Sequence, residues 1–350
     1  MGKSQKQDIR GLSRSALEKL ITGIGEKKYR AGQVYEWIWN HNADSFDDMK
    51  NIPLKLREYL DREYIINRLR IEKEQISHDG TVKTAFLTAD GGITESVAIP
   101  SAQRLTVCIS SHTGCVLGCK FCASAGVTDA KKLTCGEITD QFTAGIIYSS
   151  RKSLAVTNLV FMGMGEPLLN YENITGAIEK INEIHNFSPQ RMTVSTAGIP
   201  DKIRHLAAFP LKINLALSLH SAIDSKRNNI MPVNKKYPLN KISEALVYYH
   251  SITGKRITIE YLLLKEFNDG KDDAEALISF LRPFPVKINI IEYNRVDGSP
   301  YFPSEKKVAE QFIAMLERQN FIINIRKSRG KDINAACGQL AGRLSASYHK

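Results

Sequence analysis

The chain has 350 residues, of which 43% are hydrophobic and 24% are charged, and this composition of a folded globular protein excludes wholesale disorder. Lysine and arginine number 48 against 37 acidic residues, so the formal net charge is +11, which suits a nucleic acid or an anionic surface as a partner. No stretch approaches the roughly 18 apolar residues of a membrane helix, and the first residues lack the apolar segment of a secretory signal. We therefore expect a cytoplasmic protein that does not enter a membrane.

The first 67 residues predict a small helical domain. Residues 29–39 carry apolar side chains at helical spacing. Ser15 and Glu18 have the spacing of a capping box, which predicts that a helix begins there. We expect the aromatic side chains of this domain to lie in its core.

Residues 68–103 change to the alternating pattern of β-strands. Asp79-Gly80 and Asp90-Gly91-Gly92 are turn signals that separate the alternating segments. The segment therefore predicts a small antiparallel sheet, with strands at 69–75, 81–87 and 93–99.

From residue 104 to residue 350 the pattern is one of strands that alternate with helices. Strands are predicted at 105–110, 157–161, 191–196, 212–218, 256–263 and 286–291, with a last strand at 321–326. Helices are predicted near 136–150, 171–185, 199–207, 240–252, 272–281 and 305–319. Six such units predict an α/β fold with a parallel sheet, either an incomplete barrel or a doubly wound layer. In both, the chemistry lies at the carboxyl ends of the strands.

Three cysteines follow the first of these strands at close spacing. Cys115, Cys119 and Cys122 form a CxxxCxxC pattern, which in a cytoplasmic chain indicates a metal or catalytic site rather than a disulfide framework. Thiolates suit both iron–sulfur clusters and zinc, and His112 would be the fourth ligand of a zinc site. The single short loop favours the iron–sulfur cluster, because structural zinc sites usually draw two ligand pairs from separated segments.

The cysteine pattern and the sequence Gly163–Pro167 together resemble the radical S-adenosylmethionine superfamily. A narrower resemblance, from about Tyr29 to Gly342, is to the RlmN/Cfr family of RNA adenine methyltransferases. Seven motifs carry it in one order: Glu95–Pro100, Cys108–Cys115, Leu133–Gln141, Phe161–Leu168, Val194–Gly198, Leu217–His220 and Asp332–Leu340.

The resemblance implies a fold and a set of cofactors. The family fold is an incomplete (βα)6 barrel with a small amino-terminal helical domain, which the family uses as an RNA-binding accessory. Cys115, Cys119 and Cys122 would hold one [4Fe–4S] cluster, whose open iron chelates S-adenosylmethionine. Two molecules of S-adenosylmethionine are used per turnover, one for a methyl group and one for a 5′-deoxyadenosyl radical.

The resemblance also implies roles for three further residues. Cys337 would carry the methyl group as S-methylcysteine and couple it to the adenine. Cys108 would release the product by forming a transient disulfide with Cys337. Glu95 would accept the proton that the adenine ring loses.

Seven residues match the S-adenosylmethionine contacts of the family, and all lie near predicted strand ends. They are Gly165, Glu166, Ser195, Ser218, Leu219, His220 and Asn294. Gly165 would let the ligand approach the backbone closely. Cys135 matches no chemical role and is interpreted as structural.

The resemblance implies 23S ribosomal RNA as the substrate, at its peptidyl-transferase centre, with transfer RNA as a second substrate. It also implies a flavodoxin or ferredoxin as electron donor, and we expect a monomer.

Pro167 favours methylation of adenine C2, since the Cfr branch that methylates C8 tends to have alanine there. Four basic residues should contact RNA phosphates: Arg326, Lys327, Arg329 and Lys331. A non-catalytic RNA-binding protein with a structural zinc site is the alternative of another class.

Overall fold

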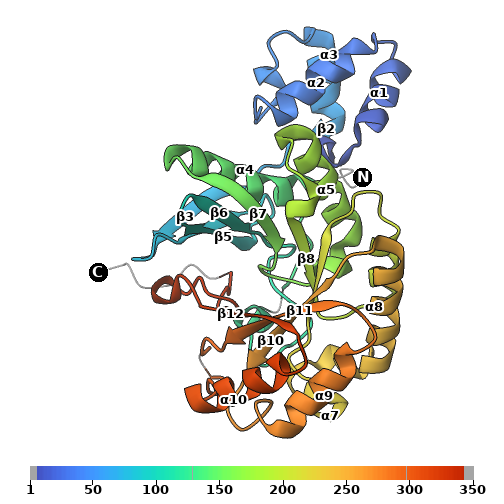
Figure 1. The fold of residues 1–350 in the computed structure, drawn as a ribbon. Coiled ribbons are helices and arrows are strands. Elements are labelled where there is room, and N and C mark those ends of the chain that lie inside the picture. Colours follow the sequence, from blue (N-terminus) through green and yellow to red (C-terminus); the bar gives the residue numbers. More distant parts are fainter. Residues whose placement is uncertain (1–5, 128, 297, 343–350) are drawn as a thin grey trace.

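The computed structural model describes residues 6–127, 129–296 and 298–342, and it contains one large curved sheet (Figure 1). Seven parallel strands follow one another both in sequence and in space. They are β6 (Arg104–Cys108), β7 (Ala155–Phe161), β8 (Met192–Thr196), β9 (Asn214–Ser218), β10 (Ile257–Leu263), β11 (Val286–Glu292) and β12 (Ile322–Arg326). The sheet ends at β12 on one side and at β3 on the other, so over the described ranges it does not close on itself. This confirms the incomplete barrel.

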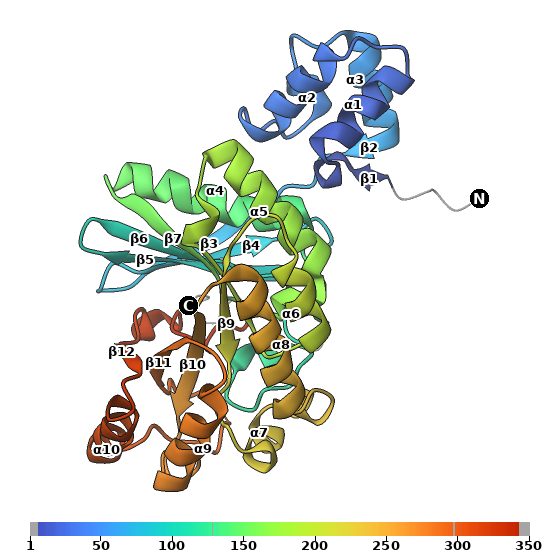
Figure 2. The same ribbon diagram turned by 45° about the vertical axis from the view of Figure 1, so that its right-hand side comes forward.

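Helices cover the outer face of the curved sheet, as Figure 2 shows. They are α4 (Cys135–Arg151), α5 (Tyr171–His185), α6 (Pro200–Ala207), α7 (Asp224–Ile230), α8 (Leu239–Thr253), α9 (Lys271–Leu281) and α10 (Lys306–Glu317). Six of these match the prediction, and α7 was not predicted. The buried core lies between this layer and the sheet, where isoleucine, leucine and valine side chains of both pack together. None of the described helices has both the length and the apolar character that crossing a membrane requires.

The three antiparallel strands are where the sequence predicted them, but they do not form a sheet of their own. β3 (Arg70–Ile76), β4 (Val82–Leu87) and β5 (Ile93–Ser101) are joined to the barrel, because β5 pairs with β6 in antiparallel register. The physical reason is that β6 has two edges and β7 occupies only one of them. β5 satisfies the backbone hydrogen bonds of the other edge.

The amino-terminal residues form a separate helical domain, which stands beyond α4 and α5 in Figure 2. Its helices α1 (Arg14–Gly23), α2 (Tyr29–Trp39) and α3 (Leu54–Glu63) enclose their own core, in which Trp39 is buried, and a short pairing of β1 (Gln7–Asp8) with β2 (Tyr64–Ile65) closes it. The predicted capping box was wrong. Ser13, not Ser15, caps α1, since its Oγ accepts a hydrogen bond from the Ala16 N–H at 3.1 Å.

One buried arginine fastens the helical domain to the barrel. The guanidinium of Arg10 is inaccessible to solvent and donates to both carboxylate oxygens of Asp140, at 2.6 and 2.9 Å, and to the Gly136 carbonyl at 2.7 Å. Asp140 and Gly136 both belong to α4. Such a bidentate pair fixes orientation as well as contact.

After β12 the chain leaves the sheet and crosses its inner, concave side; we call residues 328–342 the C-terminal strap (Figure 1). Asp332 accepts hydrogen bonds from Ser77 Oγ at 2.6 Å and from the His78 N–H at 3.2 Å. The Gly330 N–H donates to Asp79 at 3.0 Å. These contacts lie between β3 and β4, so the strap spans the open side of the barrel from one sheet edge to the other. The predicted core domain runs to residue 350, and residues 343–350 lie outside the described ranges.

Candidate active site on the open side of the barrel

The three closely spaced cysteines lie in one loop beyond the carboxyl end of β6. The Cys122 N–H donates to the Cys119 carbonyl at 3.1 Å, and Gly118 supplies a left-handed backbone, φ +68°, so the loop turns tightly. The Lys120 N–H donates to the Ile230 carbonyl at 3.0 Å, which ties the loop to the end of α7. The three thiols therefore belong to one loop supported by the barrel.

The chemistry of these thiols fits an iron–sulfur cluster. Burial raises the pKa of Cys119 well above its ordinary value, and the charges of Cys122 and Cys115 raise it further, so the three sulfurs are close enough to interact. Burial likewise raises the pKa of Cys115 to about 11. Thiols in this state need a cationic partner before they ionise, and bound iron supplies that charge.

The alternative zinc site is not formed. Among the residues that the structure describes, no three histidine, cysteine, aspartate or glutamate side chains converge as the ligands of one ion. A four-iron cluster makes a different demand, because each thiolate binds its own iron and the sulfurs can lie farther apart. The Nδ1 of His112 is 2.8 Å from Ser111 Oγ, and its ring packs against Gly165.

Gly165 and Glu166 lie in the loop after β7. Gly165 has a φ of +95°, and a Cβ there would strike the His112 ring. Both its backbone conformation and this packing therefore favour glycine at this position. Glu166 is buried, and its carboxylate accepts hydrogen bonds from the Leu168 N–H at 3.1 Å and the Ala197 N–H at 2.7 Å. Burial raises the pKa of Glu166 to about 7.

The other predicted cofactor contacts gather at neighbouring strand ends. Ser195 Oγ of β8 is 3.2 Å from Ser218 Oγ of β9. His220 has a left-handed backbone, φ +56°, and its Nδ1 accepts a hydrogen bond from the Leu262 N–H at 3.1 Å. Leu219, which lies between Ser218 and His220 in the sequence, is fully buried. The Phe121 ring of the cysteine loop meets the His220 ring edge to face, so these strand ends adjoin the loop.

Asn294, just beyond β11, has an unsatisfied polar atom. Its Oδ1 is buried and has no hydrogen-bond partner, whereas its Nδ2 donates to the Cys337 carbonyl at 3.3 Å. Buried polar atoms are usually paired. The orphaned oxygen therefore fits a donor on a bound ligand, such as the amino or hydroxyl groups of S-adenosylmethionine.

The strap carries Cys337 to the cysteine loop and to β6. The Ala123 N–H donates to the Gly338 carbonyl at 2.7 Å, and Ser124 Oγ donates to the Leu340 carbonyl at 2.6 Å. Cys337 is exposed to solvent, and desolvation by the surrounding protein raises the pKa of its thiol to about 11. Burial raises the pKa of Cys108 to about 12, and the charge of Cys337 adds to this effect. All six cysteines are free thiols.

Glu95 is buried on β5 and fully engaged with the strap. Its Oε2 accepts hydrogen bonds from the Ala341 N–H at 2.9 Å and the Gly342 N–H at 3.2 Å. Its Oε1 lies 3.4 Å from the Nζ of Lys83, which also donates to the Asn334 carbonyl at 3.3 Å. Lys83 was not among the predicted site residues. It lies between buried residues on β4, the strand that pairs with β5 and so lies beside Glu95.

Two other buried charges were missed. Arg227 lies in α7, behind the cysteine loop, and Glu260 lies in the middle of β10. Glu260 accepts a hydrogen bond from Asn289 Nδ2 at 2.7 Å, and its charge acts on the Cys337 thiol. For Glu260, a charged residue inside an otherwise apolar strand could have indicated a functional role. For Arg227 the sequence offered no such indication, because α7 was not predicted.

The four basic residues around the strap differ in their surroundings. Lys331 pairs with Glu292 at 2.8 Å, and Arg329 lies 3.9 Å from Asp79. Arg326 and Lys327 are exposed at the end of β12. These two are therefore the more available for RNA phosphates.

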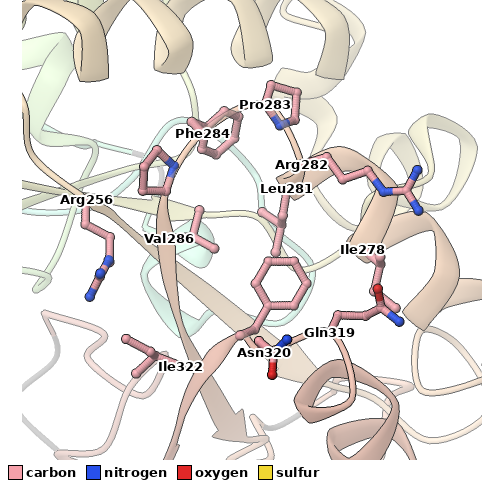
Figure 3. Close-up of a pocket in the computed structure, with 12 residues that line it drawn as sticks. Arg256, Ile278, Leu281, Arg282, Pro283, Phe284, Val286, Gln319, Asn320 and Ile322 are labelled. Atoms are coloured by element: carbon pink, nitrogen blue, oxygen red, sulfur yellow. The ribbon is translucent and has the colours of Figure 1, made fainter.

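A hollow of about 510 Å³ lies at the other end of the sheet (Figure 3). It is formed where β10, β11 and β12 begin, between Arg256, Phe284 and Ile322. It contains none of the predicted site residues, which gather where the strands end.

Comparison with protein families divides the chain in two. Residues 7–66 match the model of the ribosomal RNA large subunit methyltransferase N-terminal domain. Residues 109–281 match the model of the radical SAM superfamily. The first match coincides with the helical domain and the second with the barrel.

Individual proteins are similar over almost the whole chain. The "Probable dual-specificity RNA methyltransferase RlmN" of Christiangramia forsetii is 44% identical over 97% of this chain and 98% of its own. The "Dual-specificity RNA methyltransferase RlmN" of Geotalea uraniireducens is 37% identical over the same shares. The crystal structure of a radical SAM methyltransferase from Sphaerobacter thermophilus is 35% identical, with a TM-score of 0.88 over 96% of this chain and all of that one.

We expect the Cys119→Ala variant to lose bound iron and to stop cleaving S-adenosylmethionine, because two thiolates cannot replace three as ligands. Iron content and formation of 5′-deoxyadenosine measure this. Cys135→Ala is the matched control, since Cys135 is also a buried thiol but lies at the start of α4. A Cys119→Ala protein that keeps four irons and cleaves the cofactor would show that the ligands are assigned wrongly.

Proposed function

Because the chain belongs to the RlmN family of radical S-adenosylmethionine RNA methyltransferases, we propose that it methylates C2 of an adenosine in 23S ribosomal RNA, and of an adenosine in some transfer RNAs. The observation that carries this proposal is the pair of single thiols. Cys108 ends β6 and Cys337 lies in the strap, far apart in sequence, yet Cys108 packs in one cluster with Ala335 and Leu340 of the strap, and the charge of Cys337 acts on its thiol.

Cys115, Cys119 and Cys122 hold the [4Fe–4S] cluster in this proposal. When bound, the cluster and S-adenosylmethionine supply the methyl group and the radical that activates it. Glu166 and Asn294 offer the cofactor a carboxylate and an unsatisfied oxygen, and Ser195, Ser218, Leu219 and His220 line the strand ends beside them. Gly165 shapes the turn that places Glu166.

Cys337 provides the sulfur that carries the methyl carbon to the adenine ring. An adenine C2 has no nucleophilic lone pair, so a covalent link through this carbon is needed. Glu95 accepts the ring proton. Cys108 then attacks the sulfur of Cys337: a sulfur–sulfur bond forms, the carbon–sulfur bond breaks, and its electron pair passes to the methylene carbon, which takes a proton to become the methyl group.

The proposal also covers the carbon that is methylated, the role of the helical domain and the electron donor. Pro167, the first residue of the short turn after Glu166, favours C2 over the C8 of Cfr-type enzymes. The helical domain serves as an RNA-binding accessory. We further propose a cytoplasmic monomer that takes its electron from a flavodoxin or ferredoxin.

The two single cysteines have successive roles, so their loss should have different results. Cys337→Ala cannot carry the methyl carbon and should give neither product nor adduct. Cys108→Ala should couple to RNA but fail to release it, and a covalent protein–RNA complex should accumulate. A denaturing gel with and without ribonuclease shows this complex as a shifted band. A folded, cluster-loaded Cys108→Ala protein without that band would exclude the release role.

Binding of S-adenosylmethionine should weaken as the pH falls through about 7. The pKa of Glu166 is raised to about 7 by burial, so its carboxylate is charged above that pH and neutral below it. The neutral form loses its attraction for the cofactor's ammonium group, and the affinity should fall by up to about tenfold per pH unit. Calorimetry of the cluster-loaded protein between about pH 8 and pH 6 measures the slope.

Glu166→Gln should bind weakly at every pH and show a flat profile. Glu172→Gln is the control, since Glu172 is exposed on α5, where Lys202 lies 3.3 Å away. A wild-type profile that stays flat would remove Glu166 from the cofactor site.

RNA binding should depend on salt partly through Arg326 and Lys327. Each phosphate contact that is lost should flatten the dependence of log affinity on log salt by about 0.7–0.9. The variant with both residues changed to glutamine should therefore have a shallower slope. A variant with Lys306 and Lys307 of α10 changed to glutamine removes the same charge from a helix away from the strap, and its slope should be unchanged. Equal slopes in both variants would place the RNA elsewhere.

A further inference from the structure

Arg227 of α7 is fully buried, and its hydrogen bonds all end on uncharged oxygens. Its Nε donates to the Leu219 carbonyl at 3.0 Å, and one Nη donates to Asn234 Oδ1 at 2.5 Å. The other Nη donates to the carbonyls of Ala197 at 2.6 Å and Ser218 at 3.2 Å. Four of the five guanidinium N–H groups are thereby used. The side chain is committed to the protein and is not free to bind a ligand.

These hydrogen bonds join the segments that carry the proposed cofactor contacts. Ala197 is held through both of its backbone groups, because its N–H donates to Glu166 and its carbonyl accepts from Arg227. Ser218 and Leu219 are themselves among the proposed contacts. One guanidinium therefore fixes the ends of β8 and β9 relative to Glu166, which follows β7.

The charge of Arg227 needs a partner that its hydrogen bonds do not supply. Burial lowers the pKa of this guanidinium to about 10, and the groups that oppose this effect are Cys119, Asp224 and Glu166. Asp224 Oδ1 accepts hydrogen bonds from Asn234 Nδ2 and the Leu239 N–H, and among the described residues Asp224 makes no direct ion pair with Arg227. An isolated charge in a protein interior is costly unless an anion lies nearby.

The cysteine loop lies near this charge, because Arg227 and Cys119 act on each other electrostatically and the Lys120 N–H donates to the Ile230 carbonyl at the end of α7. Cys119, Leu117 and Phe121 pack in one apolar cluster with Ile230, Met231 and Ala197. A cluster bound by three thiolates would thus have Arg227 as a buried positive neighbour. A nearby cation in a medium of low dielectric favours the addition of an electron.

We propose that Arg227 is a positioning residue with two effects: it fixes the strand ends that bind S-adenosylmethionine, and it raises the reduction potential of the iron–sulfur cluster. The inference rests on the cofactors of the family and goes beyond the methylation of RNA. It assigns a role to a residue outside the cysteine motif and outside the proposed contacts.

Two variants separate the two effects. Arg227→Lys keeps the positive charge but cannot reproduce the planar set of four hydrogen bonds. It should bind S-adenosylmethionine about tenfold more weakly while the midpoint potential stays near that of the wild type. Arg227→Gln loses the charge, and its midpoint potential should become more negative. Calorimetry and a redox titration with dithionite, followed by absorbance, measure the two quantities in cluster-loaded protein.

Lys120→Gln is the matched control for charge. Lys120 follows Cys119 directly and carries the same charge, but it is exposed, so solvent and salt screen it. Its removal should change the potential less than Arg227→Gln does, and the change should shrink as salt is added.

A purely structural role predicts a lower unfolding temperature in both Arg227 variants without a change in potential. The inference fails if Arg227→Gln and wild type share one midpoint potential, or if Arg227→Lys binds the cofactor as tightly as wild type. Neither measurement uses RNA. Failure to methylate RNA would therefore contradict the proposed function and leave these two results to decide the role of Arg227.

Discussion

The site depends on a barrel that does not close. The parallel strands end at β12, the antiparallel strands end at β3, and the concave face between them is spanned by the C-terminal strap. The strap is held at β3–β4 by Asp332 and at the cysteine loop by the Gly338 and Leu340 carbonyls. A closed barrel would have no room for Cys337 inside its curve. In the function that we propose, the same opening gives an RNA base access to that thiol.

Buried charges organise the interior of the site. Glu166, Arg227 and the peptide of Ala197 form one hydrogen-bonded series that connects β7, β8 and β9. Glu95 and Lys83 form another on the antiparallel strands. Each charge is costly to bury without a partner, and several partners come from segments distant in sequence. These contacts therefore specify how the strand ends and loops are arranged, in addition to the general burial of apolar side chains.

Most of the fold could be predicted because its strands and helices carry strong local signals. The apolar runs of β7 to β11 predicted an α/β fold with a parallel sheet, and the family resemblance then favoured the incomplete barrel over a doubly wound layer. The pairing of β5 with β6 could not be predicted, because register between strands depends on free edges rather than on the pattern of one strand. Arg227 was missed for a related reason: α7 is short, and an arginine in a polar helix gives no sign that it is buried. The packing of His112 against Gly165 could not be predicted either, because it is visible only in three dimensions.

Glu95 links the seating of the strap to the proposed proton transfer. In this structure its Oε2 accepts two N–H groups of the strap and its Oε1 faces Lys83, which holds the strap at Asn334 as well. Both carboxylate oxygens therefore already face donors of the protein. If Glu95 is the proton acceptor that we propose, the strap around Ala341 and Gly342 has to shift and free this carboxylate when RNA enters. Lys83 remains beside Glu95 through such a movement, because both belong to adjacent strands of the sheet rather than to the strap.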